Sequence, residues 1–251
     1  MWIYRVGIRR GNRVCALIDN HTEKFLYSRF SSGTGRVGLK KQVVFFDFDG
    51  VVVDTYKSAP FAAKRLAKHL GLRRDKIDYF TNDVSKYYEN PDGSALQLFE
   101  RLFRAYKLSS NRSEIGRAYE LFQVWRTEEA RPIGNIEEFL IWAHNNNIET
   151  KILTAPDEIR GLKNRRIKTS SITYYFDTII VTDLKPGEIE PYAKGAETVP
   201  MFVVGDNKTL STAAKAGLRT VRLNTGVGAF SEAAPPTFRI SDFTQLETIL
   251  K

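Results

Sequence analysis

Val43-Val44-Phe45-Phe46-Asp47-Phe48-Asp49-Gly50 is the stretch that decides the fold. Four consecutive apolar residues predict a short strand that is buried on both faces of a parallel sheet. The strand ends at Asp47, and Asp49 follows two residues later. Because alternate residues of an extended segment point to opposite sides, one carboxylate can face a ligand while the other takes a second position around it.

Short apolar runs of the same kind recur towards the C-terminus and alternate with helical patterns. Residues 136–143 form one apolar helical stripe, and residues 210–216 form another that stops at Gly217. This alternation predicts an α/β fold with a doubly wound, Rossmann-like parallel sheet, which binds ligands at the carboxyl ends of its strands. Further strands are expected at residues 151–153, 178–181, 201–204, 220–223 and 238–240.

The segment 56–131 interrupts the alternation, because it contains three apolar helical stripes and no convincing strand. It is expected to be a helical cap over the ligand end of the sheet. The core would then comprise residues 42–55 and 132–251. Four aromatic residues of the segment are expected mostly to pack inside the cap: Tyr79, Phe80, Tyr87 and Tyr88.

The first 30 residues predict a three-stranded β-meander, and residues 31–41 predict a linker. The linker contains Gly33, Gly35 and Gly38 in the spacing of a dinucleotide-binding loop. Such a loop must open a helix, whereas here a strand follows, so we interpret the glycines as a flexible connection. The meander would extend a sheet, cover a sheet edge or join two subunits.

The net charge of +9 is concentrated at the N-terminus. Residues 1–41 hold nine basic and two acidic side chains, giving +7, and the remainder has 29 and 27, giving +2. Such a segment can attract nucleic acid or an acidic partner, or it can simply be a solvated face. Cys15 is the only cysteine, and no apolar run is long enough to span a bilayer. We therefore expect a cytoplasmic protein without a membrane segment.

Polar side chains follow the predicted strands. Thr154 ends the second strand, and Asp206 ends a later one. Pro156 favours the first turn of a helix, so free backbone N–H groups near Thr154 and Ala155 are expected to hold an anion. Lys185 stands in a loop before the strand that Asp206 ends.

Together with Asp47 and Asp49, these residues suit phosphoryl transfer. Hard oxygen ligands select Mg²⁺, which also binds substrate phosphate. The metal and a lysine would offset the charge of a phosphate and an approaching carboxylate. A carboxylate nucleophile splits the reaction into formation and hydrolysis of an acyl-phosphate.

The same residues resemble the four motifs of the haloacid dehalogenase (HAD) superfamily. The resemblance covers about residues 42–250, with the motifs in the family's order at residues 46–52, 153–154, 185–186, and 203–206 with 213–217. The helical insertion after the first strand is similar to the cap of phosphoglycolate-phosphatase-like and β-phosphoglucomutase-like members. An acid/base at Asp49 separates phosphatases and phosphomutases from the dehalogenases.

The resemblance implies a role for each matching residue. Asp47 would be the nucleophile and a metal ligand. Asp49 would be the general acid/base, and its backbone carbonyl would bind Mg²⁺. Thr154 and Lys185 would bind the transferring phosphoryl group, and Asp206 would complete the metal site.

The sequence departs from the motifs at three places. Residues 209–211 hold no acid where the fourth motif has its second one, and Asp183 either replaces it or makes ordinary loop hydrogen bonds. Ala155 stands where the second motif usually has Asn. The span from Lys185 to Asp206 is short for the family, which leaves Lys194 as an alternative active-site lysine.

The expected function is hydrolysis of a small phosphorylated metabolite. One alternative is a phosphatase for nucleotides or nucleic-acid ends, with residues 1–41 as a docking segment. Others are a phosphomutase, which needs a cap that excludes water, and a non-catalytic binding protein on the same fold. His21, His69, His144 and Cys15 have no partner at metal-ligand or nucleophile spacing, so we interpret them as structural.

Overall fold

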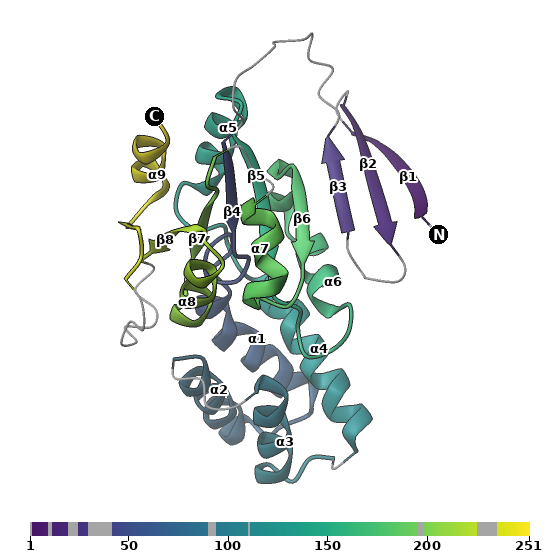
Figure 1. The fold of residues 1–251 in the computed structure, drawn as a ribbon. Helices are drawn as coiled ribbons and strands as arrows, with labels where there is room; N and C mark the ends of the chain where they lie inside the picture. Colours follow the sequence, from purple (N-terminus) through teal and green to yellow (C-terminus); the bar gives the residue numbers. More distant parts are fainter. Residues whose placement is uncertain are drawn as a thin grey trace.

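The computed structural model describes residues 42–89, 94–109, 111–194, 198–224 and 235–251, together with the backbone of three N-terminal strands. These strands are β1 (Trp2–Arg9), β2 (Asn12–Asp19) and β3 (Phe25–Arg29). They pair antiparallel in the order β1-β2-β3, which confirms the predicted meander, and β3 lies beside strand β6 (Figure 1). The predicted linker 31–41 lies outside the described residues.

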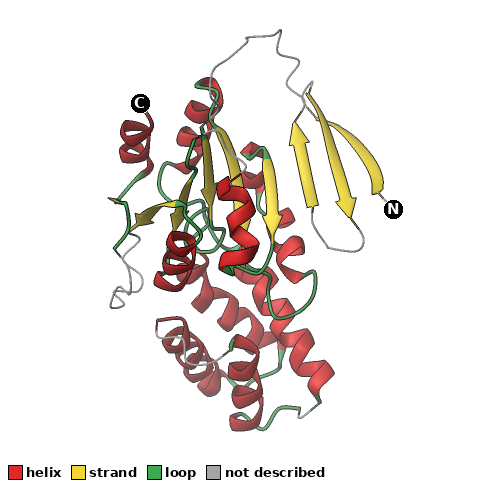
Figure 2. Ribbon diagram, viewed as in Figure 1, coloured by secondary structure: helices red, strands yellow, loops and turns green. Residues whose placement is uncertain are grey.

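The larger sheet has six parallel strands in the order β6-β5-β4-β7-β8-β9 (Figure 2). All six predicted strands are confirmed, with differences of at most two residues at their ends. Their bounds are β4 Val43–Phe46, β5 Glu149–Thr154, β6 Thr178–Val181, β7 Met201–Val204, β8 Arg219–Leu223 and β9 Phe238–Ile240.

Strand β4 lies in the interior of this sheet, with side chains in both hydrophobic layers. Val44 and Phe46 pack in the layer formed with helices α5 and α9, whereas Phe45 packs with α7 and α8. Burial on both faces explains the uninterrupted apolar run, and it confirms the doubly wound α/β fold. The helices of this part are α5 Ile136–Asn145, α6 Leu162–Thr169, α7 Pro186–Lys194, α8 Asn207–Lys215 and α9 Phe243–Leu250, with a 3₁₀ helix at Ser171–Tyr175.

Four helices are inserted between β4 and β5: α1 Thr55–His69, α2 Arg74–Glu89, α3 Ala95–Ala105 and α4 Arg112–Glu128. They enclose a hydrophobic cluster of their own, below the sheet in Figure 1. The start and end of the insertion are paired, because Asp54 N–H donates to the Arg131 carbonyl and Ile133 N–H to the Val52 carbonyl. The two chain connections between the insertion and the core therefore lie side by side near the end of β4.

The aromatic residues of α2 divide between the inside and the outside of the insertion. Phe80 and Tyr88 are buried in its cluster and Tyr87 packs against it, as predicted. Tyr79 is 66% exposed, so three of the four aromatic residues pack in the insertion, which agrees with the expectation for most of them. Helix α2 is amphipathic, and Tyr79 lies on its outer side. Among the described residues, no helix combines the length and apolar character required to cross a bilayer.

Candidate active site

The loop after β4 brings Asp47 and Asp49 to the carboxyl end of the sheet. Asp47 N–H donates to the Val203 carbonyl of β7, and a tight turn follows in which the Val52 and Val53 N–H groups both reach the Phe48 carbonyl. Gly50 has φ of +75°, a backbone conformation that favours glycine. The turn therefore directs the two carboxylates to different surroundings.

A second loop, after β7, lies directly against this turn. A Cβ atom on Gly205 would come within 3.1 Å of the Gly50 carbonyl oxygen, so a side chain there would push the two loops apart. Gly205 thereby lets Asp206 approach Asp47. Asp206 also caps helix α8, because its Oδ1 accepts the Thr209 N–H at 2.9 Å.

Asp47 is buried, with only 8% of its surface exposed. Its Oδ1 accepts hydrogen bonds from the Thr154 hydroxyl at 2.8 Å and from the Phe48 N–H at 2.7 Å. Burial and, to a smaller extent, repulsion from Asp206 raise the pKa of the Asp47 carboxyl to about 7. Asp47 and Asp206, which we call the acidic pair, are thus two neighbouring carboxylates whose joint ionisation is unfavourable.

The acidic pair fits a bound divalent cation. Carboxylate oxygens are the ligands that Mg²⁺ prefers, and a cation would relieve the repulsion that raises the pKa of Asp47. Within the described ranges, no three His, Cys, Asp or Glu side chains are grouped as a metal site. The side chain of Asp49 points to cations instead, so a third protein ligand from this loop would be its backbone carbonyl. Mg²⁺ commonly completes such a set with waters and substrate phosphate.

Asp49 lies among three buried cations. Its Oδ2 accepts from Lys163 Nζ at 2.5 Å, and its Oδ1 accepts from Arg126 at 3.3 Å and from Arg166. Burial alone would raise the pKa of Asp49, but the charges of Arg166, Lys163 and Arg126 outweigh it and hold the pKa well below its usual range. We call Lys163, Arg166 and Arg126, with the two carboxylates of Asp49 and Asp157, the cationic cluster.

Arg166 is the centre of the cationic cluster. It is fully buried, its Nη1 reaches both oxygens of Asp157 at 2.8 and 2.9 Å, and its Nε donates to the Thr127 hydroxyl at 2.9 Å. Burial lowers the pKa of a guanidinium, yet Asp49 and Asp157 raise the pKa of Arg166 above its ordinary value. This residue therefore joins α6, the loop after β5 and the end of α4 in one network.

Arg126 brings the insertion into the same network from helix α4. Its guanidinium lies 4.6 Å from the centre of the Tyr88 ring, a cation–π contact. Two atoms of helix α4, Arg126 Nε and Gln123 Oε1, are buried without a hydrogen-bond partner in the described part of the chain. A buried polar atom without a partner costs about 1–3 kcal/mol, so these atoms favour a ligand or water that would satisfy them.

The loop after β5 differs from its prediction. Pro156 was expected in the first turn of a helix near Thr154, but residues 155–161 form an irregular loop and α6 begins at Leu162. The reason is that the loop's acids have other partners: Asp157 binds Arg166, and the Glu158 carboxylate accepts the N–H groups of Ala95 and Leu96 at the start of α3. Ala155 is therefore a loop residue, and the next helix along the chain begins only at Leu162.

Of the predicted site residues, the structure brings together Asp47, Asp49, Thr154 and Asp206. It leaves the side chains of the two candidate lysines exposed. Lys185 has a side chain that is 73% exposed and pairs with Asp183 at 2.7 Å, and this contact raises the pKa of its ammonium. Lys194, 74% exposed, pairs with Glu190 at 2.5 Å. Asp183 makes a loop contact on the surface.

Three cations and one acid of the cationic cluster were missed. Arg126 follows Phe122 by four residues and so continues the predicted apolar stripe of α4, which is a signal that could have identified it. Lys163 and Arg166 lie in a short basic helix, where nothing in the sequence distinguishes the buried cations from solvated ones. Asp157 lies in the segment where Pro156 was expected to begin a helix.

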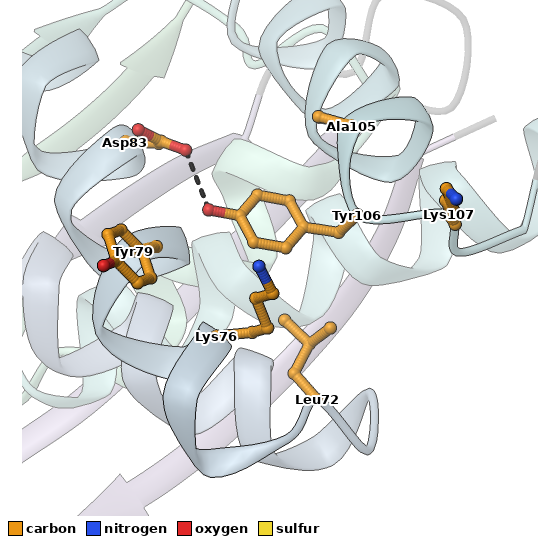
Figure 3. Close-up of a pocket in the computed structure, with 7 residues that line it drawn as sticks. All are labelled: Leu72, Lys76, Tyr79, Asp83, Ala105, Tyr106 and Lys107. Carbon is orange, nitrogen blue, oxygen red and sulfur yellow. Dashed lines mark hydrogen bonds between the residues drawn. The ribbon is translucent and has the colours of Figure 1, made fainter.

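A separate hollow of about 600 Å³ lies between α2 and α3 (Figure 3). It is lined by Leu72, Lys76, Tyr79, Asp83, Ala105, Tyr106 and Lys107. The Tyr106 hydroxyl donates to Asp83 at 2.9 Å across it. None of the residues of the acidic pair or the cationic cluster lines this hollow, so it is not part of the candidate active site.

This geometry agrees with the sequence comparisons. The sequence profile of the haloacid dehalogenase-like hydrolases matches residues 44–223. This chain therefore belongs to the haloacid dehalogenase-like hydrolase family, as the motifs indicated. No curated protein matches the chain.

Solved structures show the same fold at low sequence identity. A predicted phosphoglycolate phosphatase from Haemophilus somnus is 15% identical with a TM-score of 0.62, over 85% of this chain and 99% of that one. The magnesium-bound HAD hydrolase YfnB from Bacillus subtilis is 15% identical with a TM-score of 0.63, over 85% and 100%. A protein assigned as a β-phosphoglucomutase from Thermotoga maritima is 15% identical with a TM-score of 0.61, over 83% and 98%.

Proposed function

We propose that this hydrolase is a Mg²⁺-dependent phosphatase that cleaves a small phosphomonoester through an aspartyl-phosphate on Asp47. The observation that carries the proposal is the meeting of Asp47, Thr154 and Asp206 at the carboxyl edge of the sheet, with Asp49 two residues from the nucleophile. In HAD members with these motifs, the same residue types perform this reaction. The insertion α1–α4 would act as the cap that selects the substrate.

Mg²⁺ would be held by the acidic pair and the Asp49 backbone carbonyl, and it would offset the charge of the phosphate. An Asp47 oxygen attacks phosphorus, the bond to the ester oxygen breaks, and that oxygen takes a proton from Asp49. Asp49 then accepts a proton from a water whose oxygen attacks the same phosphorus. The bond to Asp47 breaks, and inorganic phosphate leaves.

The cationic cluster explains how Asp49 serves in both steps. In the described state three cations hold its pKa low, so it is ionised and ready to act as a base. A phosphate dianion beside these cations offsets their charge and raises the pKa of Asp49, which favours the protonated acid. With three cations against two carboxylates, the cluster has a formal excess of one positive charge that attracts the dianion.

The test is phosphate release from a panel of phosphomonoesters, with Mg²⁺ and with EDTA, for the wild type and Asp47→Asn. We expect Mg²⁺-dependent turnover that falls by at least about 10⁴-fold in the variant, as for removal of other catalytic nucleophiles. A folded wild type without turnover on any ester, or an Asp47→Asn variant with normal turnover, would overturn the proposal.

A further inference from the structure

We propose that three polar side chains of the insertion, Tyr88, Gln123 and Arg126, bind a hydroxyl group of the substrate's leaving group. We call these three residues the polar subsite. The substrate class that follows is a phosphate ester of a polyol or sugar, with a hydroxyl close to the ester oxygen. This inference rests on the proposed function, because it identifies the leaving group of the same reaction.

The polar subsite lies where the leaving group has to be. In the proposed reaction Asp49 gives its proton to the ester oxygen, so the leaving group must lie next to the Asp49 carboxylate. Arg126 contacts that carboxylate from the insertion, since its Nη2 lies 3.3 Å from Asp49 Oδ1. This contact is possible because α4 packs against α6 of the core, and Arg126 stands in the last turn of α4 (Figure 1).

The three side chains of the polar subsite meet at the Tyr88 ring. Gln123 Nε2 donates to the Tyr88 hydroxyl at 3.4 Å, and the Arg126 guanidinium lies 4.6 Å from the centre of the same ring. Gln123 and Arg126 are three residues apart on α4, so they share one face of the helix. Gln123, Arg126 and Tyr88 are only 3%, 5% and 9% exposed, so bulk water does not satisfy their polar atoms.

Two atoms of the polar subsite have no hydrogen-bond partner among the described residues, and they are of opposite kinds. Arg126 Nε is a donor, whereas Gln123 Oε1 is an acceptor. A hydroxyl group is both, because its oxygen can accept the Arg126 N–H while its hydrogen is donated to Gln123. One hydroxyl of the leaving group therefore satisfies both atoms.

Other leaving groups fit the polar subsite less well. A carboxylate only accepts hydrogen bonds, so it would leave Gln123 Oε1 without a partner and would place a second negative charge beside Asp49. An alkyl chain would leave both buried atoms without a partner. Nε and Nη2 belong to one planar guanidinium, so a hydroxyl bound to Nε has to be close to the ester oxygen that Asp49 protonates.

The experiment compares three esters of similar size: 2-hydroxyethyl phosphate, ethyl phosphate and phosphoglycolate. Ethyl phosphate lacks only the hydroxyl, and phosphoglycolate has a carboxylate in place of the hydroxymethyl group. The measurement is kcat/KM for phosphate release by the wild type with Mg²⁺. We expect the value for 2-hydroxyethyl phosphate to exceed the other two at least about tenfold, because a site built for a hydroxyl rejects analogues that leave its polar atoms unpartnered.

Two variants connect this preference to the polar subsite. Gln123→Met replaces the amide by a thioether, a weak acceptor, so the ratio of kcat/KM for 2-hydroxyethyl and ethyl phosphate should fall to within about threefold. Tyr88→Phe removes the hydroxyl that holds the Gln123 amide and should lower the same ratio at least about threefold. Tyr106→Phe is the matched control, because its hydroxyl binds Asp83 at the separate hollow. It should change neither kcat/KM value more than about twofold.

Three results would overturn the inference. Equal kcat/KM for 2-hydroxyethyl and ethyl phosphate in the wild type would indicate that a water molecule, and not the substrate, occupies the polar subsite. A preference for phosphoglycolate would indicate that the Gln123 amide is reversed and that the subsite offers only donors. A preference for the hydroxyl that survives in both Gln123→Met and Tyr88→Phe would mean that other residues bind it. If melting curves show that Gln123→Met does not fold, Tyr88→Phe and the wild-type ratios still decide.

A failure of the proposed function gives a different result. A wild type without turnover on any of the three esters would refute the proposed phosphatase. The esters then stay intact, so their Kd values, measured by calorimetry with Mg²⁺, test the polar subsite by itself. We expect 2-hydroxyethyl phosphate to bind at least about tenfold more tightly than the other two, and equal or undetectable binding would overturn the inference.

Discussion

The acidic pair and the cationic cluster lie on either side of one short turn, yet they place their aspartates under opposite electrostatic conditions. Asp47 faces Asp206, and burial with this repulsion raises its pKa to about 7. Asp49, two residues later, faces three cations that keep its pKa well below the usual range. Both carboxylates are largely removed from water, so exposure does not explain the difference.

The comparison shows that the sign of the neighbouring charges decides whether the pKa of each buried carboxylate lies above or below its ordinary value. The acidic pair lacks positive charge and favours a divalent cation. The cationic cluster has an excess of positive charge and favours an anion. A phosphate–Mg²⁺ unit would supply both charges, which is why we propose that the two regions together bind it.

After the loss of activity expected for Asp47→Asn, the largest expected effect comes from breaking the cationic cluster with Asp49→Asn. General acid–base catalysis contributes about 10²–10⁴-fold, so kcat should fall by that amount for an alkyl phosphate. The loss should be smaller for p-nitrophenyl phosphate, because nitrophenolate leaves without a proton. Phosphate release from the two esters provides the measurement.

Asp183→Asn is the matched control for this variant, since it removes an exposed aspartate that pairs with Lys185. It should leave kcat unchanged within about twofold, as expected for an exposed ion pair. Equal losses for both esters in Asp49→Asn would exclude Asp49 as the acid. Melting curves distinguish this result from unfolding, because the variant leaves buried cations short of a partner.

The second effect concerns the acidic pair and its pH dependence without metal. Native Asp47 keeps its proton up to about pH 7, whereas in the unfolded chain it ionises near its ordinary pKa of 3.8. Between these values the native state binds more protons, so the free energy of unfolding falls as pH rises, by at most about 4 kcal/mol. Asp47→Asn should lack this decline and be more stable than the wild type at pH 8.

Urea unfolding in EDTA from pH 4 to pH 8, with both proteins in parallel, measures this difference. Groups that titrate elsewhere affect both proteins and cancel in the comparison. Parallel stability curves for the wild type and Asp47→Asn would contradict the raised pKa, and with it the contrast between the two regions.

The smallest expected effect comes from replacing two buried threonines, one in contact with each region. Thr154 donates to Asp47 at 2.8 Å, and Thr127 accepts from Arg166 at 2.9 Å. Each hydrogen bond involves an ionisable partner, so replacement by Val should cost about 1.5–3 kcal/mol. We expect Thr154→Val to lose mainly kcat and Thr127→Val to lose mainly stability, measured by phosphate release and urea unfolding. A large loss of kcat in Thr127→Val alone would reverse the roles of the two regions.

The fold was largely predictable because its signals are local. Strand β4 is buried on both faces, so every residue from Val44 to Phe46 is apolar, and the run is visible without any partner. Gly217, with φ of +84°, follows α8 where the apolar stripe was predicted to stop. The start of α6 was mispredicted because the partners of Asp157 and Glu158 lie in other elements.

The candidate site was predicted in its acidic half and missed in its cationic half. Asp47, Thr154 and Asp206 follow parallel strands, and the carboxyl ends of such strands meet at one edge by the rules of the fold. Lys163 and Arg126 come from helices on opposite sides of the boundary between core and insertion. Their approach to Asp49 depends on how α4 packs against α6, which no short-range spacing encodes.

The sequence by itself determined the parallel sheet, the helical insertion and the acids at the strand ends, because each follows from residue type and periodicity along a short segment. Only the tertiary structure decided which lysine is buried beside the acids, since Lys163 and Lys185 differ in exposure and not in chemistry. It also decided the contrasting ionisation of Asp47 and Asp49. A pKa depends on burial and on charges a few ångströms away, and here those charges come from residues more than 70 positions distant in the chain.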